Sequence, residues 1–315
     1  YIALLPKISL QKAGPLMAEA LMRWEHPERG PQNPADFVPF AEKTGFITQL
    51  SNWVIDGSLA IAAQWEQRGM PLGISVNISP RDLGSPEFAT YVVERLRAHR
   101  LRGNCLTLEV TEPTVIDASP IVKQNLDVLW RLGVKIAIDD FGSGFASLDE
   151  LRSLPLSYIM IDRQYIRGLT ADAASKIVVQ SAIDIGHSLG VEVVAEGVET
   201  EQQLDELREM GCDQVQGFFV GKPLTNDEFD AWVKAQQGRF SVGGLKDAPV
   251  SAGEPMASVP GEVVELTLEA PSPSSRHEPA DDLGGEEILL DLGPAPGGND
   301  DIELAFDVAP DPSRR

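Results

Sequence analysis

The segment KIAIDDFGSGFASL, residues 135–148, joins a short apolar run to two adjacent carboxylates and a Gly-rich turn. Strand-like residues lead directly into Asp139 and Asp140, as when a buried strand delivers acidic side chains to a surface. Neighbouring carboxylates repel one another, so a proton, a partner or a cation has to offset their charge. Other strand-like segments of the chain end in the same way, which indicates a shared site.

Strand and helix patterns alternate regularly over residues 1–240. Strands are expected at about 1–9, 15–24, 73–77, 105–109, 134–140, 158–162, 191–196 and 214–220. Amphipathic helices are expected from residue 34 and at 51–68, 86–99, 119–132, 147–154, 171–189, 200–210 and 225–237. Short strands that are apolar on both faces and separated by helices favour a parallel sheet covered by helices.

The number of these strands favours a closed sheet. Seven or eight strands in one domain predict a TIM-type (β/α)8 barrel, here with an irregular first strand. An open doubly wound sheet is the alternative, although no Gly-rich dinucleotide loop follows the first strand. We therefore expect a barrel domain over residues 1–240 and a separate tail over 241–315.

The tail, residues 241–315, differs in composition from the rest of the chain. It is rich in Pro and Gly and carries 16 Asp and Glu against 4 Lys and Arg, more than half of the net charge of −22. Such a segment buries too little apolar surface to fold, so we predict a disordered acidic tail. Two mixed acidic and apolar patches, 287–290 and 301–306, are candidate partner-binding segments. A solvated tail with no partner is the alternative.

Charge and rare residues narrow the classes of function. A net charge of −22 argues against binding to nucleic-acid polymers or anionic membranes. The sequence has no apolar run of about eighteen residues and opens without Met or a signal segment, so we expect a cytoplasmic piece of a longer protein without membrane contact. Cys105 and Cys212 are expected to be buried free thiols, and the four His residues form no zinc pattern.

Polar residues stand at or near the carboxyl ends of the predicted strands. They are Glu19, Arg23, Asn77, Glu109, Glu112, Asp139, Asp140, Asp162, Glu196, Glu199 and Gln216. In a barrel these ends share one rim, where active sites lie. Any single acid is more often a helix N-cap or a surface charge, but converging anions must be protonated, paired or bound to cations.

The ligand types at this rim favour particular metals. Oxygen donors without His or Cys favour Mg²⁺ or Mn²⁺. Two such ions about 3.5–4 Å apart activate water and stabilise the leaving oxygen in phosphodiester cleavage. The residues alone therefore predict a metal-dependent hydrolase, with a phosphate ester as its substrate.

Seven motifs in this order carry a resemblance to a known family. They are EALMRW at 19–24, NIS at 77–79, EVTE at 109–112, DDFGSGF at 139–145, ID at 161–162, AEGVE at 195–199 and QGF at 216–218. Together they resemble the EAL domain, the cyclic-di-GMP phosphodiesterase family, over about residues 1–237. The resemblance implies a TIM-type barrel that opens cyclic-di-GMP to linear pGpG by metal-activated water. It also implies two divalent cations, a homodimer, and an upstream GGDEF or sensory domain.

The resemblance implies metal and catalytic roles for the matched residues. One ion would be held by Glu19, Asn77, Glu109 and Asp139, and the second by Asp139, Asp140 and Glu196. Glu196 would also assist deprotonation of the attacking water. Asp162 would support the ligands of the second ion, and Gln216 would position a metal-bound water or the nucleotide.

The remaining matched residues are implied in binding and support. Nucleotide contacts would come from Arg23, Leu21, Gln216, Phe141 and Gly142. An Arg suits this role because its fork of donors matches a phosphate. Glu112 and Glu199 would brace the site from behind the metal ligands. Residues 141–147 would form a mobile lid that couples the metal site to dimerisation, the alternative being a plain Gly-rich turn.

The chain departs from the family pattern inside the predicted site. The family reads Lys-Ile-Asp where this chain has Met160-Ile161-Asp162, and strand alternation points Met160 into the site beside Asp162. The family lysine is thought to orient or polarise the attacking water, and loss of one such group costs about 10²–10³ in rate. The segment Leu4-Leu5-Pro6 replaces a Tyr-Gln-Pro that helps contact the nucleotide, and Met17 replaces a usual glycine.

These departures leave two classes of function open. The first is a working phosphodiesterase, slowed by Met160 and supported by the complete set of carboxylates. The second is a catalytically degenerate module that senses cyclic-di-GMP or regulates a partner domain. A scaffold with neither binding nor activity is a third hypothesis.

Overall fold

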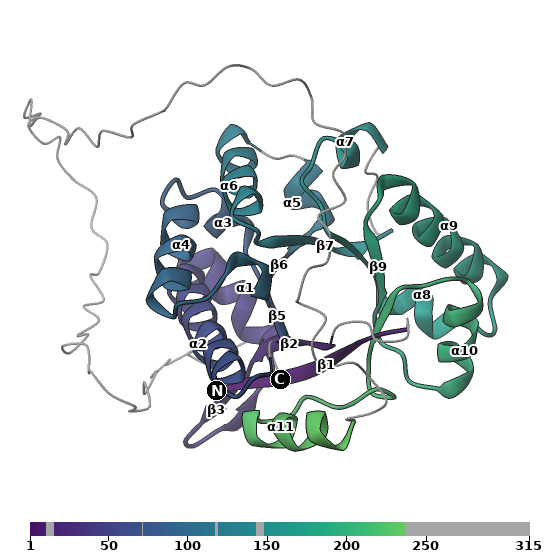
Figure 1. Ribbon diagram of the computed structural model, residues 1–315, viewed down its shortest axis with the longest axis horizontal. Coiled ribbons are helices and arrows are strands. Elements are labelled where there is room, and N and C mark those ends of the chain that lie inside the picture. The colour runs from purple at the N-terminus through teal and green to yellow at the C-terminus, as the bar shows by residue number, and fades with distance from the viewer. Residues whose placement is uncertain (11–15, 71, 117–118, 143–147, 237–315) are drawn as a thin grey trace, which may run out of the picture. The chain divides into compact units, whose positions relative to one another are not determined.

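The computed structural model describes residues 1–10, 16–70, 72–116, 119–142 and 148–236, and within them it contains the predicted barrel (Figure 1). Eight strands close in the order β1-β10-β9-β8-β7-β6-β5-β2. They are β1 (Ile2–Ser9), β2 (Leu16–Met22), β5 (Gly73–Asn77), β6 (Leu106–Thr111), β7 (Lys135–Phe141), β8 (Tyr158–Ile161), β9 (Glu192–Ala195) and β10 (Gln214–Gln216). Closure rules out the open sheet. The predicted tail at 241–315 and positions 143–147 of the predicted lid lie outside the described residues.

The first strand is irregular in direction. β1 runs antiparallel to both of its neighbours, β2 and β10, whereas the other neighbouring pairs of barrel strands are parallel. Only six residues separate the end of β1 from the start of β2, and a parallel pair needs a crossover of about a dozen residues or more. The irregular first strand is therefore confirmed, and the expectation of a wholly parallel sheet is corrected.

Helices surround the barrel (Figure 1), and they include the predicted ones together with three short helices that the pattern did not predict, at 80–83, 112–116 and 163–168. They are α1 (Pro34–Thr44), α2 (Ile47–Gln67), α3 (Pro80–Leu83), α4 (Phe88–Ala98), α5 (Glu112–Ile116), α6 (Pro120–Arg131), α7 (Leu148–Arg152), α8 (Arg163–Gly168), α9 (Ala173–Leu189), α10 (Glu201–Glu209) and α11 (Asn226–Ala235), with a 3₁₀ turn at Gly103–Cys105. Local sequence sets their starts. Thr200 and Thr225 each open a helix with a capping box. In this motif the threonine hydroxyl accepts a hydrogen bond from the backbone N–H three residues later, and the side chain of that later residue accepts one from the threonine backbone N–H. None of the helices in the described ranges has the length and apolar character needed to cross a membrane.

Strand β10 ends earlier than expected, at Gln216 rather than near residue 220. The cause is Gly217, whose φ of +149° takes the chain out of the strand. A Cβ at this position would collide with the backbone of Val198, so only glycine fits the close approach. The backbone N–H of Val198 donates a 3.1 Å hydrogen bond to the carbonyl oxygen of Gln216 across this contact.

Alternation along the strands separates two sets of buried side chains. On β7, Ile136 and Ile138 pack in the main core beneath the helices. Ala137, between them, points into the barrel, where a second apolar cluster forms from Met17, Ala137, Tyr158, Met160 and Val194. Because side chains alternate between the two faces of a strand, Asp139, two residues after Ala137, also points toward the barrel interior.

Hairpin β3 (Trp24–His26) and β4 (Gly30–Gln32) follows β2 and is a separate two-stranded sheet. Trp24 packs edge-on against Phe37 of α1, with the ring centroids 5.4 Å apart. The hairpin thereby ties the end of β2 to the first helix.

Candidate metal centre at the barrel rim

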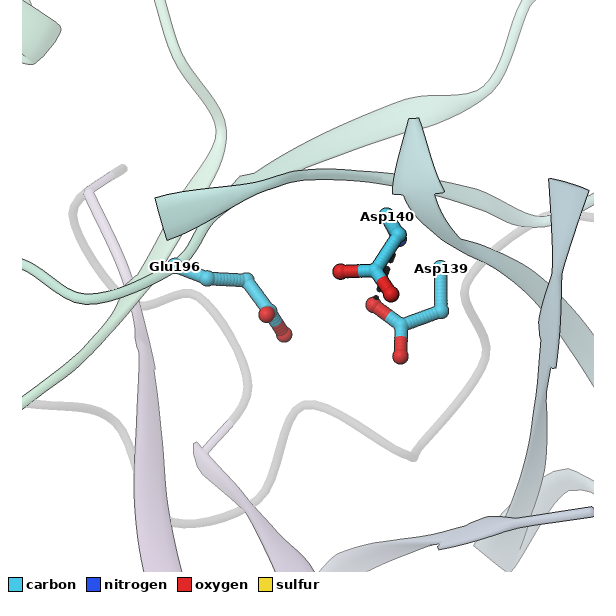
Figure 2. Close-up of side chains that lie close together, drawn as sticks. All are labelled: Asp139, Asp140 and Glu196. Carbon is cyan, nitrogen blue, oxygen red and sulfur yellow. Dashed lines mark hydrogen bonds between the residues drawn. The ribbon is translucent and has the colours of Figure 1, made fainter. Parts of the chain in front are cut away.

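Three carboxylates from two strands meet at the carboxyl-end rim of the barrel (Figure 2). Asp139 and Asp140 belong to β7, and Glu196 directly follows β9. Each offers one oxygen, and these oxygens all lie within 4.8 Å of one another. A group of anions this close needs protons or a cation between them, so the three residues form a candidate metal site.

The backbone at Asp140 is what brings both neighbouring acids into this cluster. Asp140 has a φ of +55°, in the left-handed region, and the register of β7 against β8 shifts between Ile138 and Phe141. Without this irregularity, strand alternation would send the two carboxylates to opposite faces. A non-glycine residue in this conformation costs about 1–3 kcal/mol, a strain that is typical of functional sites.

Two amide side chains connect the acids on the other side of the rim. The Asn77 amide donates to Glu19 Oε1 at 2.7 Å. The Gln216 amide donates to Glu19 Oε2 at 3.0 Å and to Glu196 Oε1 at 2.7 Å. Gln216 thus bridges the two glutamates and fixes the orientation of both carboxylates.

Burial and mutual repulsion perturb the acids of this rim. Burial and repulsion from Glu109 raise the pKa of Glu19 to about 8. Burial, Glu109 and Asp140 raise the pKa of Asp139 to about 7. Burial, together with Asp139, raises the pKa of Glu196 well above its ordinary value. Near neutral pH, Glu19 and, in part, Asp139 would hold protons unless a cation took their place.

Lys7 is a further member of the site that the sequence patterns did not predict. It lies near the carboxyl end of β1, is 2% exposed, and donates a 2.8 Å ion-pair hydrogen bond to Glu109 Oε1. Burial alone lowers the pKa of Lys7, but attraction to Glu109, Glu19 and Glu196 outweighs it, and the pKa is raised. One signal was present in the sequence: a charged residue inside an apolar strand is rarely buried without a partner.

The donor set suits a hard divalent cation. Every candidate ligand atom is a carboxylate or amide oxygen, the type that Mg²⁺ and Mn²⁺ prefer. Glu109 Oε2 and Gln216 Oε1 are buried and accept no hydrogen bond within the described part of the chain. Buried oxygens rarely stay without a partner, so these two atoms are suited to a cation or its water. The rim therefore fits the metal chemistry that the sequence predicted.

Two predicted site residues, Asp162 and Glu112, make hydrogen bonds to backbone amides outside the cluster of Asp139, Asp140 and Glu196. Asp162 is the N-cap of α8, and its Oδ1 accepts a 2.8 Å hydrogen bond from the backbone N–H of Gln164. The charge of Asp162 also adds to the effect of burial, and together they raise the pKa of Asp140. Glu112 is buried at the start of α5, and its Oε2 accepts the Gly142 amide at 3.3 Å.

Other predicted residues border the rim without entering the cluster. Arg23 donates to the Met22 carbonyl oxygen at 2.9 Å, and Leu21 is half-buried on β2. Phe141 is buried. Glu199 is exposed, so its predicted bracing role remains a prediction.

Met160 lies below the carboxylates, inside the barrel. Its side chain is 1% exposed and belongs to the interior cluster with Met17, Ala137, Tyr158 and Val194. Met160 thus points into the barrel interior, and its predicted place in the site beside Asp162 stays a prediction. Both departures that bring a methionine into the family pattern, at 17 and 160, therefore fill the same apolar space.

Comparisons with known proteins agree with this geometry. The family model of the EAL domain matches residues 1–223. Cyclic di-GMP phosphodiesterase PA2567 of Pseudomonas aeruginosa is 35% identical over 229 residues, covering 73% of this chain and 39% of the relative. The bifunctional diguanylate cyclase/cyclic di-GMP phosphodiesterase MucR of the same organism is 40% identical over 233 residues, covering 72% of this chain and 33% of MucR. This chain thus spans well under half the length of either relative.

A solved structure shows the same likeness in three dimensions. The "PaMucR Phosphodiesterase, c-di-GMP complex" superposes with a TM-score of 0.70 at 37% sequence identity, covering 73% of this chain and 93% of that structure. The family match covers most of the chain and includes the strands whose ends carry the clustered acids. On its sequence, its closed barrel and these comparisons, this chain belongs to the EAL domain family.

Proposed function

We propose that the barrel is a metal-dependent phosphodiesterase that hydrolyses cyclic-di-GMP to linear pGpG. The observation that carries the proposal is the convergence of Asp139, Asp140 and Glu196, whose oxygens lie within 4.8 Å at the rim. Relatives named as cyclic di-GMP phosphodiesterases, and a similar structure named as a complex with c-di-GMP, support the choice of substrate.

The carboxylates and amides of the rim would hold two divalent cations, Mg²⁺ or Mn²⁺. The first would be held by Glu19, Asn77, Glu109 and Asp139, and the second by Asp139, Asp140 and Glu196, with Asp162 supporting the second set. When bound, such ions polarise a water molecule and offset the charge that develops on the leaving oxygen. The close packing of the three acids and the raised pKa of Glu19 and Asp139 support a site built around a cation.

The chain's own residues would do the remaining work. Glu196 is proposed to accept a proton from the attacking water, since its carboxylate lies beside those of Asp139 and Asp140. Gln216 keeps Glu19 and Glu196 in fixed orientations through its two hydrogen bonds. Arg23 is proposed to meet a ligand phosphate, since its guanidinium lies near the rim just after β2.

Further residues are proposed to contact the nucleotide or to brace the site. Leu21, Phe141 and Gly142 lie at the ends of β2 and β7 and are proposed nucleotide contacts. Glu112 supports the turn after β7 through its bond to the Gly142 amide. Tyr165 adds a second support, because its hydroxyl donates to the Gly142 carbonyl oxygen at 2.7 Å.

A second candidate is a module that binds cyclic-di-GMP without hydrolysing it. Met160 favours this candidate, because a buried thioether stands in the barrel interior where a lysine is expected from the family pattern. Metal and nucleotide binding need not be lost, since the carboxylates are all present. The two candidates therefore differ in turnover and not in affinity.

The setting of the barrel is also a proposal. We propose a homodimer and an upstream GGDEF or sensory domain, in keeping with the longer relatives and with the diguanylate cyclase named in one of them. Cys105 and Cys212 are free and buried, which suits the reducing cytoplasm that we propose as the location.

Turnover by the purified chain tests the proposal directly. The 315-residue chain is incubated with cyclic-di-GMP and Mg²⁺ or Mn²⁺, and pGpG is followed by chromatography while nucleotide affinity is measured separately. We expect pGpG that disappears on chelation. Tight nucleotide binding without product, together with turnover gained on Met160→Lys, would establish the binding module instead. Absence of nucleotide binding with and without metal would reject both candidates.

A further inference from the structure

Lys7 is a buried cation directly beneath the carboxylates of the rim. It faces inward from the antiparallel strand β1, opposite Gln216 on one side and Met17 on the other. Its ammonium donates to Glu109 Oε1 at 2.8 Å and lies 3.5 Å from Ser75 Oγ. A buried ammonium costs several kcal/mol of desolvation, so it is stable only with such partners.

Packing does not explain why this position holds a lysine. The strand partner Met17 belongs to the apolar cluster that also contains Met160, whereas the side chains that Lys7 contacts, Glu109 and Ser75, are polar. A methionine, which has nearly the same length as a lysine, would suit this space without the cost of burying a charge. The lysine must therefore serve the acid that it contacts.

The contact leaves the two oxygens of Glu109 in different situations. Oε1 is occupied by Lys7, whereas Oε2 is buried and accepts no hydrogen bond from any described residue. Glu109 lies on β6 beside Asn77 of β5, and its charge raises the pKa of both Glu19 and Asp139. A carboxylate held through one oxygen can rotate little, and its second oxygen keeps a fixed direction.

We propose that Lys7 is a positioning residue of the metal centre, which holds Glu109 through Oε1 so that Oε2 is directed at a divalent cation. The inference rests on the proposed function, because it concerns the same metal centre. It assigns β1, which carries none of the predicted ligands, a part in forming the site.

A competing explanation is that Lys7 only balances charge. The two explanations predict opposite changes in metal affinity when the lysine is replaced by a neutral side chain of similar shape. Loss of a positioning partner weakens metal binding, typically 10–100-fold. Loss of a mere counter-charge removes repulsion between two cations and strengthens metal binding.

The test measures Mn²⁺ binding to the full chain without nucleotide, by calorimetry and by the electron paramagnetic resonance spectrum of the bound ion. For Lys7→Met we expect an affinity about 10–100-fold weaker than wild type and an altered spectrum. Lys135→Met is the matched control, because Lys135 donates to the Tyr158 hydroxyl at 2.8 Å and not to a carboxylate. We expect its Mn²⁺ affinity and spectrum to equal those of wild type.

Several outcomes overturn the proposal. Unchanged or tighter Mn²⁺ binding by folded Lys7→Met does so, because it leaves charge balance as the only role. If circular dichroism shows that Lys7→Met does not fold, Lys7→Arg is titrated instead. Its bulkier guanidinium should displace Glu109 and weaken binding about threefold or more, and unchanged affinity would again reject positioning.

Failure of this inference is distinguishable from failure of the proposed function. Wild-type chain that binds Mn²⁺ but yields no pGpG ends the phosphodiesterase proposal, while the effect of Lys7→Met on Mn²⁺ can still be measured. Wild-type chain that yields pGpG, together with Lys7→Met of unchanged Mn²⁺ affinity, ends the positioning role alone.

Discussion

The backbone N–H of Asp140 donates a hydrogen bond to the Asp139 carboxylate at 2.8 Å, and these adjacent residues of one strand present both acids to the same site (Figure 2). Consecutive strand residues normally point to opposite faces. The left-handed backbone at Asp140, φ +55°, is the local cause of the exception.

Replacement of Asp140 by glycine should separate strain from metal binding. Glycine adopts φ +55° without steric cost, so we expect unfolding free energy to stay within about 1 kcal/mol of wild type or to rise. Mn²⁺ affinity should fall at least tenfold, because one carboxylate of the cluster is lost. Arg100→Gly is the matched control, since Arg100 has a φ of +58° and is not part of the cluster. Full Mn²⁺ affinity in Asp140→Gly would remove Asp140 from the metal centre.

The bridge made by Gln216 should be needed for metal affinity. Gln216→Met keeps the side-chain length but loses the donations to Glu19 and Glu196, at 3.0 and 2.7 Å. We expect Mn²⁺ affinity and turnover to fall about 10–100-fold. Gln214→Met, two residues earlier on the same strand, removes a bond to Glu192 instead and should leave Mn²⁺ affinity unchanged. Equal losses in the two variants would mean that Gln216 acts only through the stability of β10.

Stability of the metal-free protein should fall as pH rises. The pKa of Glu19 is raised to about 8 and that of Asp139 to about 7 in the folded chain, so the folded state prefers their protonated forms. Their contribution to stability is complete below the unfolded pKa values near 4 and is lost as pH approaches 7–8. We expect the Tm of chelator-treated protein to drop by roughly 5–10 °C between pH 5 and 8.

Divalent cations should cancel this drop. Added Mn²⁺ is expected to raise the Tm more at pH 8 than at pH 5, because at pH 5 protons occupy the carboxylates that would bind it. Scanning calorimetry of the same sample with and without chelator, at pH 5 and at pH 8, measures how the Tm changes with pH in each case. A Mn²⁺-induced shift that is equal at the two pH values would contradict the prediction.

A lysine at position 160 should increase turnover. Met160 is buried in the barrel interior below the acids, and an ammonium there would add positive charge near the charge that develops during hydrolysis. One electrostatic group of this kind contributes about 10²–10³ in rate, so we expect kcat to rise by up to that factor while the Kd for cyclic-di-GMP changes little. Met160→Leu, which fills similar space without charge, should match wild type. No gain from Met160→Lys in a folded protein would show that Met160 is not what limits catalysis.

Much of the fold could be predicted because short apolar strands and amphipathic helices leave periodic patterns in the sequence. The barrel and the inward direction of Met160 follow from such patterns. The early end of β10 could not be predicted in this way. It depends on the close approach of Gly217 to Val198, two residues from different segments that meet only in three dimensions. The direction of β1 left a signal in the six residues before β2, too few for a crossover.

The meeting of Asp139, Asp140 and Glu196 could also be predicted, since they stand at or near the carboxyl ends of strands and a barrel gathers such ends at one rim. The sequence did not predict Lys7, because its partner Glu109 is 102 residues away and only the closed barrel brings the two together. It also could not show which acids enter the cluster and which, like Asp162, cap a helix as well.

The sequence by itself determined the kind of fold and the oxygen chemistry of the site, because residue types and their spacing are local properties. The tertiary structure alone decided how the acids are used. A shift in register between β7 and β8 and the left-handed backbone at Asp140 place two neighbouring carboxylates beside Glu196. The physical reason is that side-chain direction at this rim depends on strand pairing and backbone conformation, which arise from contacts between distant segments and leave no local pattern in the sequence.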